Sequence, residues 1–265
     1  MRKFKIFDSH THAYPDEIAE KARINLGKFY EFDVPNSPTL TDLLNSQRGS
    51  ESSGFALFSV ATTPEQVVKI NNWLNGIKDE NCEFKIILFA AIHQDFENKP
   101  GELERVLKLG FKGVKIHPDI QRVDIDSPKL MDLYAAAEGR AIVYFHAGDE
   151  RYDYSLPEKI VKIKEMFPKL EIIAAHLGGY QKWKTACEVY KKQDIYFDTS
   201  STLWAIPPNE AREIIVNYNA ERILFGTDFP IRKVREELEY LDELNLDENL
   251  LEKILYKNAE RLFDL

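Results

Sequence analysis

Histidine is the residue type whose placement in this sequence points most clearly to chemistry. The chain has six histidines, and each lies at or near the end of a short apolar run: His10, His12, His93, His117, His146 and His176. Imidazole is the commonest side-chain metal ligand and the usual general acid or base near neutral pH. The pattern therefore predicts a site assembled from residues that are far apart in the sequence.

His10 and His12 are separated by one residue, at the end of the apolar run Phe4–His12. Side chains alternate between the two faces of a strand, so both imidazoles point the same way. Two imidazoles that face the same way can share one cation, and we predict that both bind a metal ion.

Two further runs end in a single polar side chain, His146 and Asp228. A carboxylate at the inner end of a buried strand has to be paired or bound to a cation. Together with His10 and His12 they give three imidazoles and one carboxylate, a ligand set suited to Zn²⁺ or another divalent first-row metal. We expect one ion, with two ions as the alternative.

Lys115 and His117 lie two residues apart, so both are expected to face inward at the end of their strand. A buried lysine there either binds substrate as a cation or pairs with Asp228 or another buried acid. We assign both residues to substrate binding.

Three arginines follow the candidate site residues by four or five positions, in three different loops: Arg122, Arg151 and Arg232. Guanidinium groups bind carboxylates through two parallel hydrogen bonds. We therefore predict a small anionic substrate with one or more carboxylates, although loop arginines also commonly face water. Trp204 either forms an apolar wall of the pocket or is an exposed loop residue.

The elements that must position these residues alternate between short apolar runs and segments of helical spacing. Helices are expected to begin near Asp16, Pro64, Pro100, Pro128, Pro157, Tyr180, Pro207 and Ile231. Strands are expected over Phe4–His12, Phe55–Thr62, Phe84–His93, Gly113–His117, Ala141–His146, Glu171–His176, Ile195–Thr199 and Arg222–Asp228. Eight such pairs favour an α/β fold, a (β/α)₈ TIM barrel, whose strand ends face the catalytic mouth.

A doubly wound open sheet has the same local alternation, but no glycine-rich phosphate loop follows the first strand. The longest irregular insertion, residues 26–53, is expected to supply a flap or a short helix over the first strand. Residues 236–265 add helix that closes the barrel, so we expect residues 1–265 to form a single domain.

The net charge of -9 and the pI near 5.3 argue against a nucleic-acid or anionic-membrane surface. The sequence contains no apolar stretch of about 18 residues and no signal-peptide pattern at its start, so we expect a cytoplasmic protein. A small molecule is the expected partner, and a homo-oligomer is compatible with these features. Cys82 and Cys187 form no C-x-x-C pattern and are expected to be buried or idle thiols.

Four segments resemble the motifs of the amidohydrolase superfamily: Asp-Ser-His-Thr-His, Phe-His-Ala-Gly, Ala-His-Leu-Gly-Gly and Gly-Thr-Asp-Phe-Pro. They fall in order on the first, fifth, sixth and eighth strands. Within the superfamily the chain most resembles the amidohydrolase-2 branch. That branch includes hydrolases, lactonases and non-oxidative decarboxylases related to aminocarboxymuconate-semialdehyde decarboxylase.

This resemblance implies roles for three more residues. His176 would polarise the substrate and carry a proton, or bind a second metal. Gly-Val-Lys-Ile-His-Pro resembles the fourth strand of dihydroorotase-type members, in which the lysine is carboxylated, so Lys115 and His176 would then complete a site for two metals. His93 occupies a position that usually lines the pocket without binding metal.

The reaction we expect is metal-dependent hydrolysis of a small, carboxylate-bearing amide, lactone or ester. A bound cation lowers the pKa of water toward about 7. Asp228 then takes the proton, and His176 stabilises the oxyanion or protonates the leaving group. The alternative is a lyase, a metal-dependent non-oxidative decarboxylase of a small aromatic or unsaturated carboxylic acid, in which His176 handles the proton. A barrel that binds without catalysis is the remaining alternative.

Overall fold

The computed structural model describes residues 4–50, 52–80, 83–191 and 193–265. Cys82 lies outside the described residues, as do residues 1–3, with which the expected absence of a signal peptide begins. Cys187 is half-buried. Among the described residues, no helix has the length and apolar character needed to cross a bilayer.

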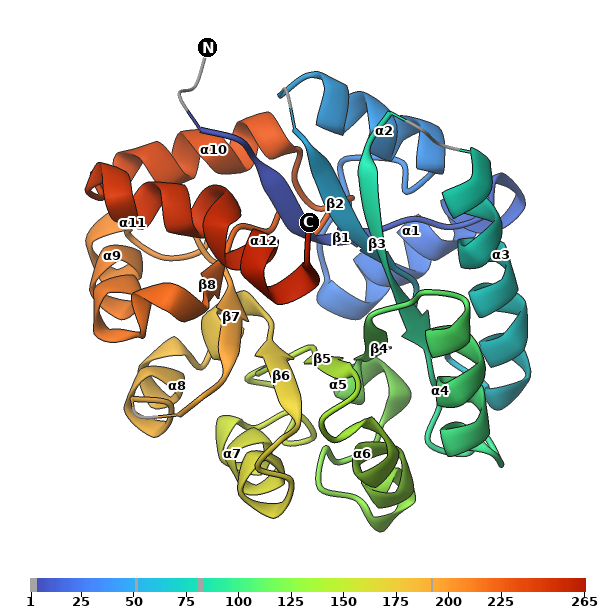
Figure 1. Ribbon diagram of the computed structural model, residues 1–265. Helices are drawn as coiled ribbons and strands as arrows, with labels where there is room; N and C mark the ends of the chain where they lie inside the picture. The colour runs from blue at the N-terminus through green and yellow to red at the C-terminus, as the bar shows by residue number, and fades with distance from the viewer. Residues whose placement is uncertain (1–3, 51, 81–82, 192) are drawn as a thin grey trace. The chain divides into compact units, whose positions relative to one another are not determined.

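Eight strands alternate with helices along the chain (Figure 1). The strands are β1 (Phe7–His12), β2 (Gly54–Phe58), β3 (Lys85–Ala91), β4 (Gly113–Ile116), β5 (Ile142–Phe145), β6 (Glu171–Ala174), β7 (Tyr196–Asp198) and β8 (Ile223–Leu224). The α-helices are α1 (Asp16–Tyr30), α2 (Leu40–Arg48), α3 (Val67–Glu80), α4 (Lys99–Lys108), α5 (Pro118–Gln121), α6 (Met131–Ala137), α7 (Pro157–Met166), α8 (Trp183–Val189), α9 (Pro208–Asn217), α10 (Val234–Glu243), α11 (Glu248–Glu252) and α12 (Asn258–Phe263). Short 3₁₀ turns are η1 (Pro64–Gln66), η2 (Pro128–Leu130), η3 (His176–Gly178) and η4 (Ala220–Arg222), and η5 (Lys253–Lys257) is a π-helical turn.

The strands form one eight-stranded sheet in the order β1 to β8. Neighbours from β3 to β7 pair in parallel. Sequential order with a helix after each strand is the topology of a (β/α)₈ barrel, so the expected fold is confirmed. A doubly wound sheet would instead reverse its strand order at a switch point.

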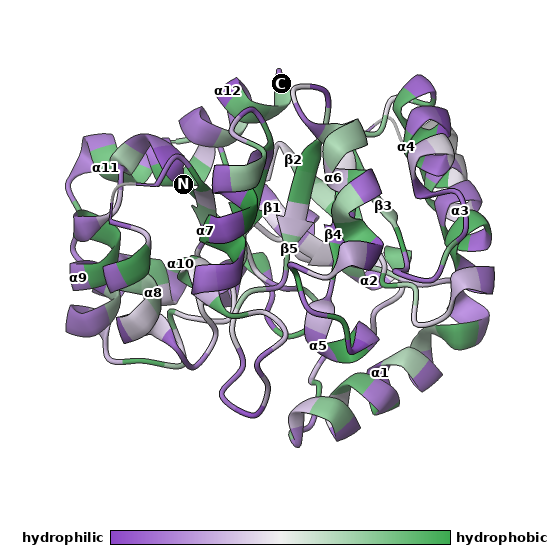
Figure 2. Cartoon of the chain, turned by 90° about the horizontal axis from the view of Figure 1, so that it is seen from below, coloured by the Kyte–Doolittle hydropathy of each residue, from purple (hydrophilic) through white to green (hydrophobic). Residues whose placement is uncertain are grey.

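The local sequence explains the elements and their bounds. Strands β1, β2, β4 and β5 are buried along their whole length. In β2 and β5 this suits the runs of apolar residues, as in a sheet covered on both faces, whereas β1 buries mostly polar side chains. The helices carry both hydrophobic and hydrophilic residues along their length (Figure 2). In α7 the buried positions include Ile160 and Ile163, one helical turn apart.

Four α-helices begin three residues later than the sequence predicts. At α3 and α6 the 3₁₀ turns η1 and η2 occupy the predicted starts, whereas α8 begins at Trp183 rather than Tyr180 and α10 at Val234 rather than Ile231. Gln181 has a φ of 60°, which a continuing helix does not allow. The start of α10 is set by its N-cap, because the Lys233 N–H donates to Glu236 Oε2 over 2.8 Å.

The insertion at residues 26–53 is more helical than expected. Helix α1 continues to Tyr30 and ends where Glu31 turns left-handed at a φ of 60°. The short helix anticipated in this insertion is α2, whose N-cap Thr39 accepts a hydrogen bond from the Asp42 N–H over 3.1 Å. After β8, the expected C-terminal helical region consists of α10, α11, η5 and α12.

The chain packs as two compact units, and the expectation of a single domain stays a prediction. The first contains Met1–Leu57, Cys82–Ile87 and Thr199–Leu265, and the second contains Phe58–Asn81 and Leu88–Asp198. In the first unit, β1 bonds to the chain around and after β8: Ser9 N–H donates to Phe225 O over 2.8 Å, and the Asp228 N–H donates to His10 O over 2.9 Å. These bonds join the first strand to the chain that directly follows the last strand. The core of the second unit includes Phe58, Phe89 and Tyr144, whose rings meet edge to face.

Candidate functional site

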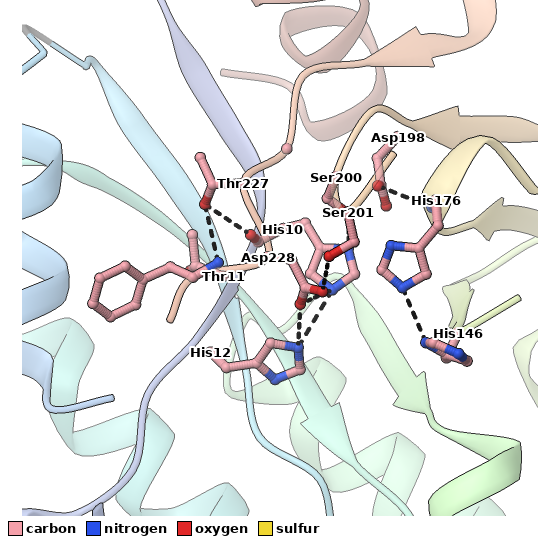
Figure 3. A network of polar contacts seen from close by, with 12 residues as sticks. His10, Thr11, His12, His146, His176, Asp198, Ser200, Ser201, Thr227 and Asp228 are labelled. Atoms are coloured by element: carbon pink, nitrogen blue, oxygen red, sulfur yellow. Dashed lines mark hydrogen bonds and ion pairs between the residues drawn. The ribbon is translucent and has the colours of Figure 1, made fainter. Parts of the chain in front are cut away.

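Two histidines of β1 and one aspartate after β8 converge in the first unit (Figure 3). Oδ1 of Asp228 lies 3.2 Å from His10 Nε2 and 3.4 Å from His12 Nε2, and the two imidazole nitrogens lie 3.3 Å apart. His10 is 1% exposed and His12 is 9% exposed. The structure thus brings together three of the four residues predicted to bind the metal.

Two serines after β7 fix the orientation of this group. Ser201 Oγ donates to Asp228 Oδ2 over 2.7 Å, which leaves Oδ1 facing both histidines. Ser200 Oγ lies 3.0 Å from His10 Nδ1. Histidine ligands usually hydrogen-bond through the nitrogen that does not bind metal, and ligating carboxylates are themselves hydrogen-bonded. Three donor atoms that converge with this support fit a divalent cation.

Behind the histidines, Asp8 holds β1 to the chain after β8. Its Oδ1 accepts the backbone N–H groups of His10 at 3.2 Å and Thr227 at 3.0 Å. Its Oδ2 accepts Gln47 Nε2 at 3.0 Å and the Thr227 hydroxyl at 2.8 Å. The side chain is fully buried, and this burial raises the pKa of Asp8 to about 6 against the opposing effect of the hydrogen bonds.

Two residues predicted to bind substrate also meet in the first unit. The guanidinium carbon of Arg232 lies 4.5 Å from the centre of the Trp204 ring, a cation–π contact. Among the described residues, the buried indole Nε1 of Trp204 has no hydrogen-bond partner. The pair offers a cation and an N–H donor next to an apolar ring.

In the second unit, His146 lies among other predicted site residues. Its Nδ1 lies 3.0 Å from Nε2 of His176, and its ring stacks on that of His117 with centroids 4.0 Å apart. Its Nε2 lies 3.7 Å from Asp119 Oδ2. The assignment of His146 as a fourth metal ligand stays a prediction.

Asp119 is a buried acid that sequence reasoning did not single out. Its Oδ2 accepts the Ser155 hydroxyl over 2.6 Å, and its buried Oδ1 has no hydrogen-bond partner among the described residues. Burial, together with the smaller effect of the nearby Asp149 carboxylate, raises the pKa of Asp119 to about 7 against the opposing hydrogen bond from Ser155. With His117 and His146 it forms a second group whose donor atoms lie within 4.8 Å of one another.

His176 sits in a backbone held from two sides. Its N–H donates to Asp198 Oδ1 over 3.1 Å, and its carbonyl accepts the Trp183 indole N–H over 3.0 Å. Its φ of 60° is in the left-handed region, which is uncommon for a residue other than glycine. Such backbone conformations cluster at functional sites.

Lys115 lies in the core of the second unit. The residue is buried as expected, at 2% exposed, and it lies between two aromatic rings. Its Nζ lies 4.3 Å from the centre of the Tyr144 ring and 4.8 Å from that of Phe58. The sequence did not indicate these cation–π contacts. The two expected roles of Lys115, binding the substrate as a cation or pairing with Asp228 or another buried acid, stay predictions. Carboxylation of Lys115 and its role in a second metal site stay predictions.

Arg151 also has an unforeseen partner. Its guanidinium bonds to both oxygens of the fully buried Asp149, at 2.9 and 2.7 Å, so much of its charge is already balanced. Arg122 is exposed and follows α5 with a φ of 55°. A role for either arginine in substrate binding stays a prediction.

Some of the residues that sequence reasoning missed carried a usable signal. Asp8 belongs to the Asp-Ser-His-Thr-His motif, and Ser200 and Ser201 follow a strand end. Gln47 and Ser155 carry no such signal, because their partners Asp8 and Asp119 lie 39 and 36 residues away in the sequence.

Proteins of similar sequence or structure include several decarboxylases. The chain is 28% identical over 120 residues to Decarboxylase orsB of Emericella nidulans, a match that covers 37% of this chain and 35% of that protein. The dihydroxybenzoic acid decarboxylase of Polaromonas sp. JS666, solved with manganese and the inhibitor 2-nitroresorcinol, superposes with a TM-score of 0.76 at 16% identity, over 99% of this chain and 97% of that one. The 5-carboxyvanillate decarboxylase of Sphingomonas paucimobilis superposes with a TM-score of 0.75 at 14% identity, over 99% and 100%.

At these identities the two solved structures show a common fold. The sequence itself matches the family model described as Amidohydrolase, Amidohydro_2, over residues 7–265. The match includes all four motifs on which the sequence resemblance depends, and it confirms that resemblance. The chain therefore belongs to the amidohydrolase family.

Proposed function

We propose that this protein is a metal-dependent, non-oxidative decarboxylase of a small aromatic carboxylic acid. This is the alternative function that the sequence analysis gave, and the comparisons favour it over the hydrolase that we first expected. The convergence of His10, His12 and Asp228 carries the proposal, because it supplies a cation site where a substrate anion would be held.

The relatives support the choice of reaction. The curated relative and the two solved structures described above are named as decarboxylases, and two of these names specify an aromatic acid. The Polaromonas enzyme was solved with manganese. We therefore propose one divalent first-row cation and include Mn²⁺ beside the expected Zn²⁺.

The chain's own residues have distinct tasks in this proposal. His10, His12 and Asp228 would hold the cation, which when bound attracts substrate oxygens and stabilises negative charge. His146 is proposed as a further ligand. Arg232, with Trp204 beside it, would bind a carboxylate.

Decarboxylation needs one proton at the ring carbon that loses CO₂. The carbon–carbon bond breaks, CO₂ leaves, and the proton takes its place on the ring. We assign that proton to His176, whose backbone is fixed by Asp198 and Trp183. A histidine suits this task because its pKa lies near neutral pH.

The test is a screen of the protein loaded separately with Zn²⁺ and Mn²⁺. We expect CO₂ release from a hydroxylated benzoic acid, with loss of the ring carboxylate in the product. The Asp228→Asn variant should lose this activity, whereas the exposed Lys257→Gln variant should keep it. Hydrolysis of lactones or amides without CO₂ release would contradict the proposal and restore the hydrolase.

A further inference from the structure

Two histidines follow the ends of the neighbouring strands β3 and β4 in the second unit. In the parallel pairing of β3 and β4, Ala91 is the partner of Lys115. His93 and His117 each lie two residues further on, and both are 5% exposed. Because adjacent strands lie about 4.8 Å apart, the two residues follow neighbouring strand ends at one edge of the sheet.

Backbone N–H groups decide which nitrogen of each ring carries the proton. The Asp95 N–H donates to His93 Nδ1 over 3.2 Å, and the Ile120 N–H donates to His117 Nδ1 over 3.3 Å. A backbone N–H is always a donor, so Nδ1 must be the acceptor in both rings. A neutral imidazole has one N–H, which therefore lies on Nε2.

Gln121 joins the backbone next to both histidines. Its Nε2 donates to Ile92 O over 2.6 Å and to Ala61 O over 2.9 Å, and its Oε1 accepts the His117 N–H over 3.0 Å. The side chain is 6% exposed. One buried amide thus links the three chain segments that follow β2, β3 and β4. It thereby fixes the backbone next to His93 and the backbone of His117 relative to each other.

We propose that His93 and His117 form a pair of neutral Nε2–H donors that bind two neighbouring oxygens of the substrate. This rests on the proposed function, which requires a small anionic substrate with several oxygens, and it names how that substrate is recognised. A carboxylate, or a carboxylate beside a ring hydroxyl, presents two such oxygens. Gln121 is the positioning residue of the pair.

The alternative use of His117, as a metal ligand with Asp119 and His146, is less favourable. A neutral imidazole that accepts the Ile120 N–H at Nδ1 has its proton at Nε2 and no lone pair left for a cation. For His93, burial lowers the pKa, while Asp95 and Glu65 raise it and Lys129 lowers it further. The net lowering favours the neutral ring.

The tautomers can be observed directly. Long-range ¹H–¹⁵N spectra of the ¹⁵N-histidine-labelled, metal-loaded protein at pH 7.5 should show two neutral rings protonated on Nε2. Signals that disappear in the His93→Asn and His117→Asn variants assign them. Protonation on Nδ1, or a doubly protonated ring, at either position would overturn the inference.

Binding tests the role of the pair. Asparagine keeps an acceptor near the position of Nδ1 but does not reach Nε2, whereas the glutamine amide nitrogen lies near Nε2. With 2,6-dihydroxybenzoate as the probe in calorimetry, each asparagine variant should lose roughly tenfold to a hundredfold in affinity. Each glutamine variant should stay within about a factor of three of wild type. Thermal unfolding of all four variants checks that they are folded.

The outcomes separate this inference from the proposed function, because neither the spectra nor the binding requires turnover. Equal affinities in the asparagine and glutamine variants would overturn the donor pair even if CO₂ is released. A clear difference between them would support the pair even if no CO₂ is released, and only the proposed function would then fail. Absence of probe binding to wild type would overturn the inference.

Discussion

Asp8 offers a sharp test of how the candidate metal group is held in place. Asp8→Ala removes the acceptor of four hydrogen bonds, two of them from the backbone N–H groups of His10 and Thr227. Those two N–H groups cannot rotate toward other partners. Each buried donor left unsatisfied costs about 1–3 kcal/mol, so the loss for the two is about 2–6 kcal/mol.

Asp8→Asn should behave differently. The amide oxygen can replace Oδ1 and accept both backbone N–H groups. On the other side, the Gln47 amide can turn so that Oε1, which has no hydrogen-bond partner among the described residues, accepts from the new NH₂ group. The Thr227 hydroxyl can likewise rotate to become an acceptor. The substitution also removes a buried charge, so we expect a change within about 1 kcal/mol.

The assay is thermal unfolding followed by circular dichroism at pH 7.5, with a chelator present because bound metal would add stability to the native state. At about 2–4 °C per kcal/mol, Asp8→Ala should lower Tm by roughly 4–24 °C, and Asp8→Asn by only a few degrees. Equal losses in the two variants would show that the negative charge matters rather than the pattern of acceptors. An Asp8→Ala variant as stable as wild type would refute the network itself.

The remaining predictions concern metal, turnover, substrate and pH. Asp228→Asn should weaken metal binding at least tenfold, measured as metal per chain after dialysis. His176→Asn should retain its metal but lose roughly a hundredfold or more in kcat, and loss of metal would instead assign His176 as a ligand. Arg232→Ala should raise KM for an acidic substrate about tenfold, with Arg232→Lys only partly restoring it; an unchanged KM would remove Arg232 from the pocket. Burial lowers the pKa of His93 below the ordinary histidine value of 6.5, so this residue's contribution to stability is present above pH 6.5 and is lost as pH falls toward the folded-state pKa. Wild type should therefore lose stability relative to His93→Gln below pH 6.5, as measured by the urea midpoints of unfolding. If the midpoints of the two proteins change with pH in the same way, this prediction is wrong.

Much of the fold could be predicted because its signals are local. Each of the eight expected strands is present, although β8 is reduced to Ile223–Leu224, and each expected helix begins within three residues of its predicted start. Strand alternation also placed His10 and His12 on one face, and the position of Asp228 at the end of the last apolar run placed it within reach of them. For these features, two or three neighbouring residues are enough to predict the local structure.

The sequence by itself determined the order of strands and helices, the family, and the residue types of the candidate metal site, because periodicity and short motifs are properties of neighbouring residues. Only the tertiary structure decided the partners: Asp8 with Thr227, which are 219 residues apart, Lys115 with its two aromatic rings, and the backbone N–H groups that donate to His93 and His117. A hydrogen bond depends on atoms about 3 Å apart in space. Which distant groups come that close is set by how the strands and helices pack.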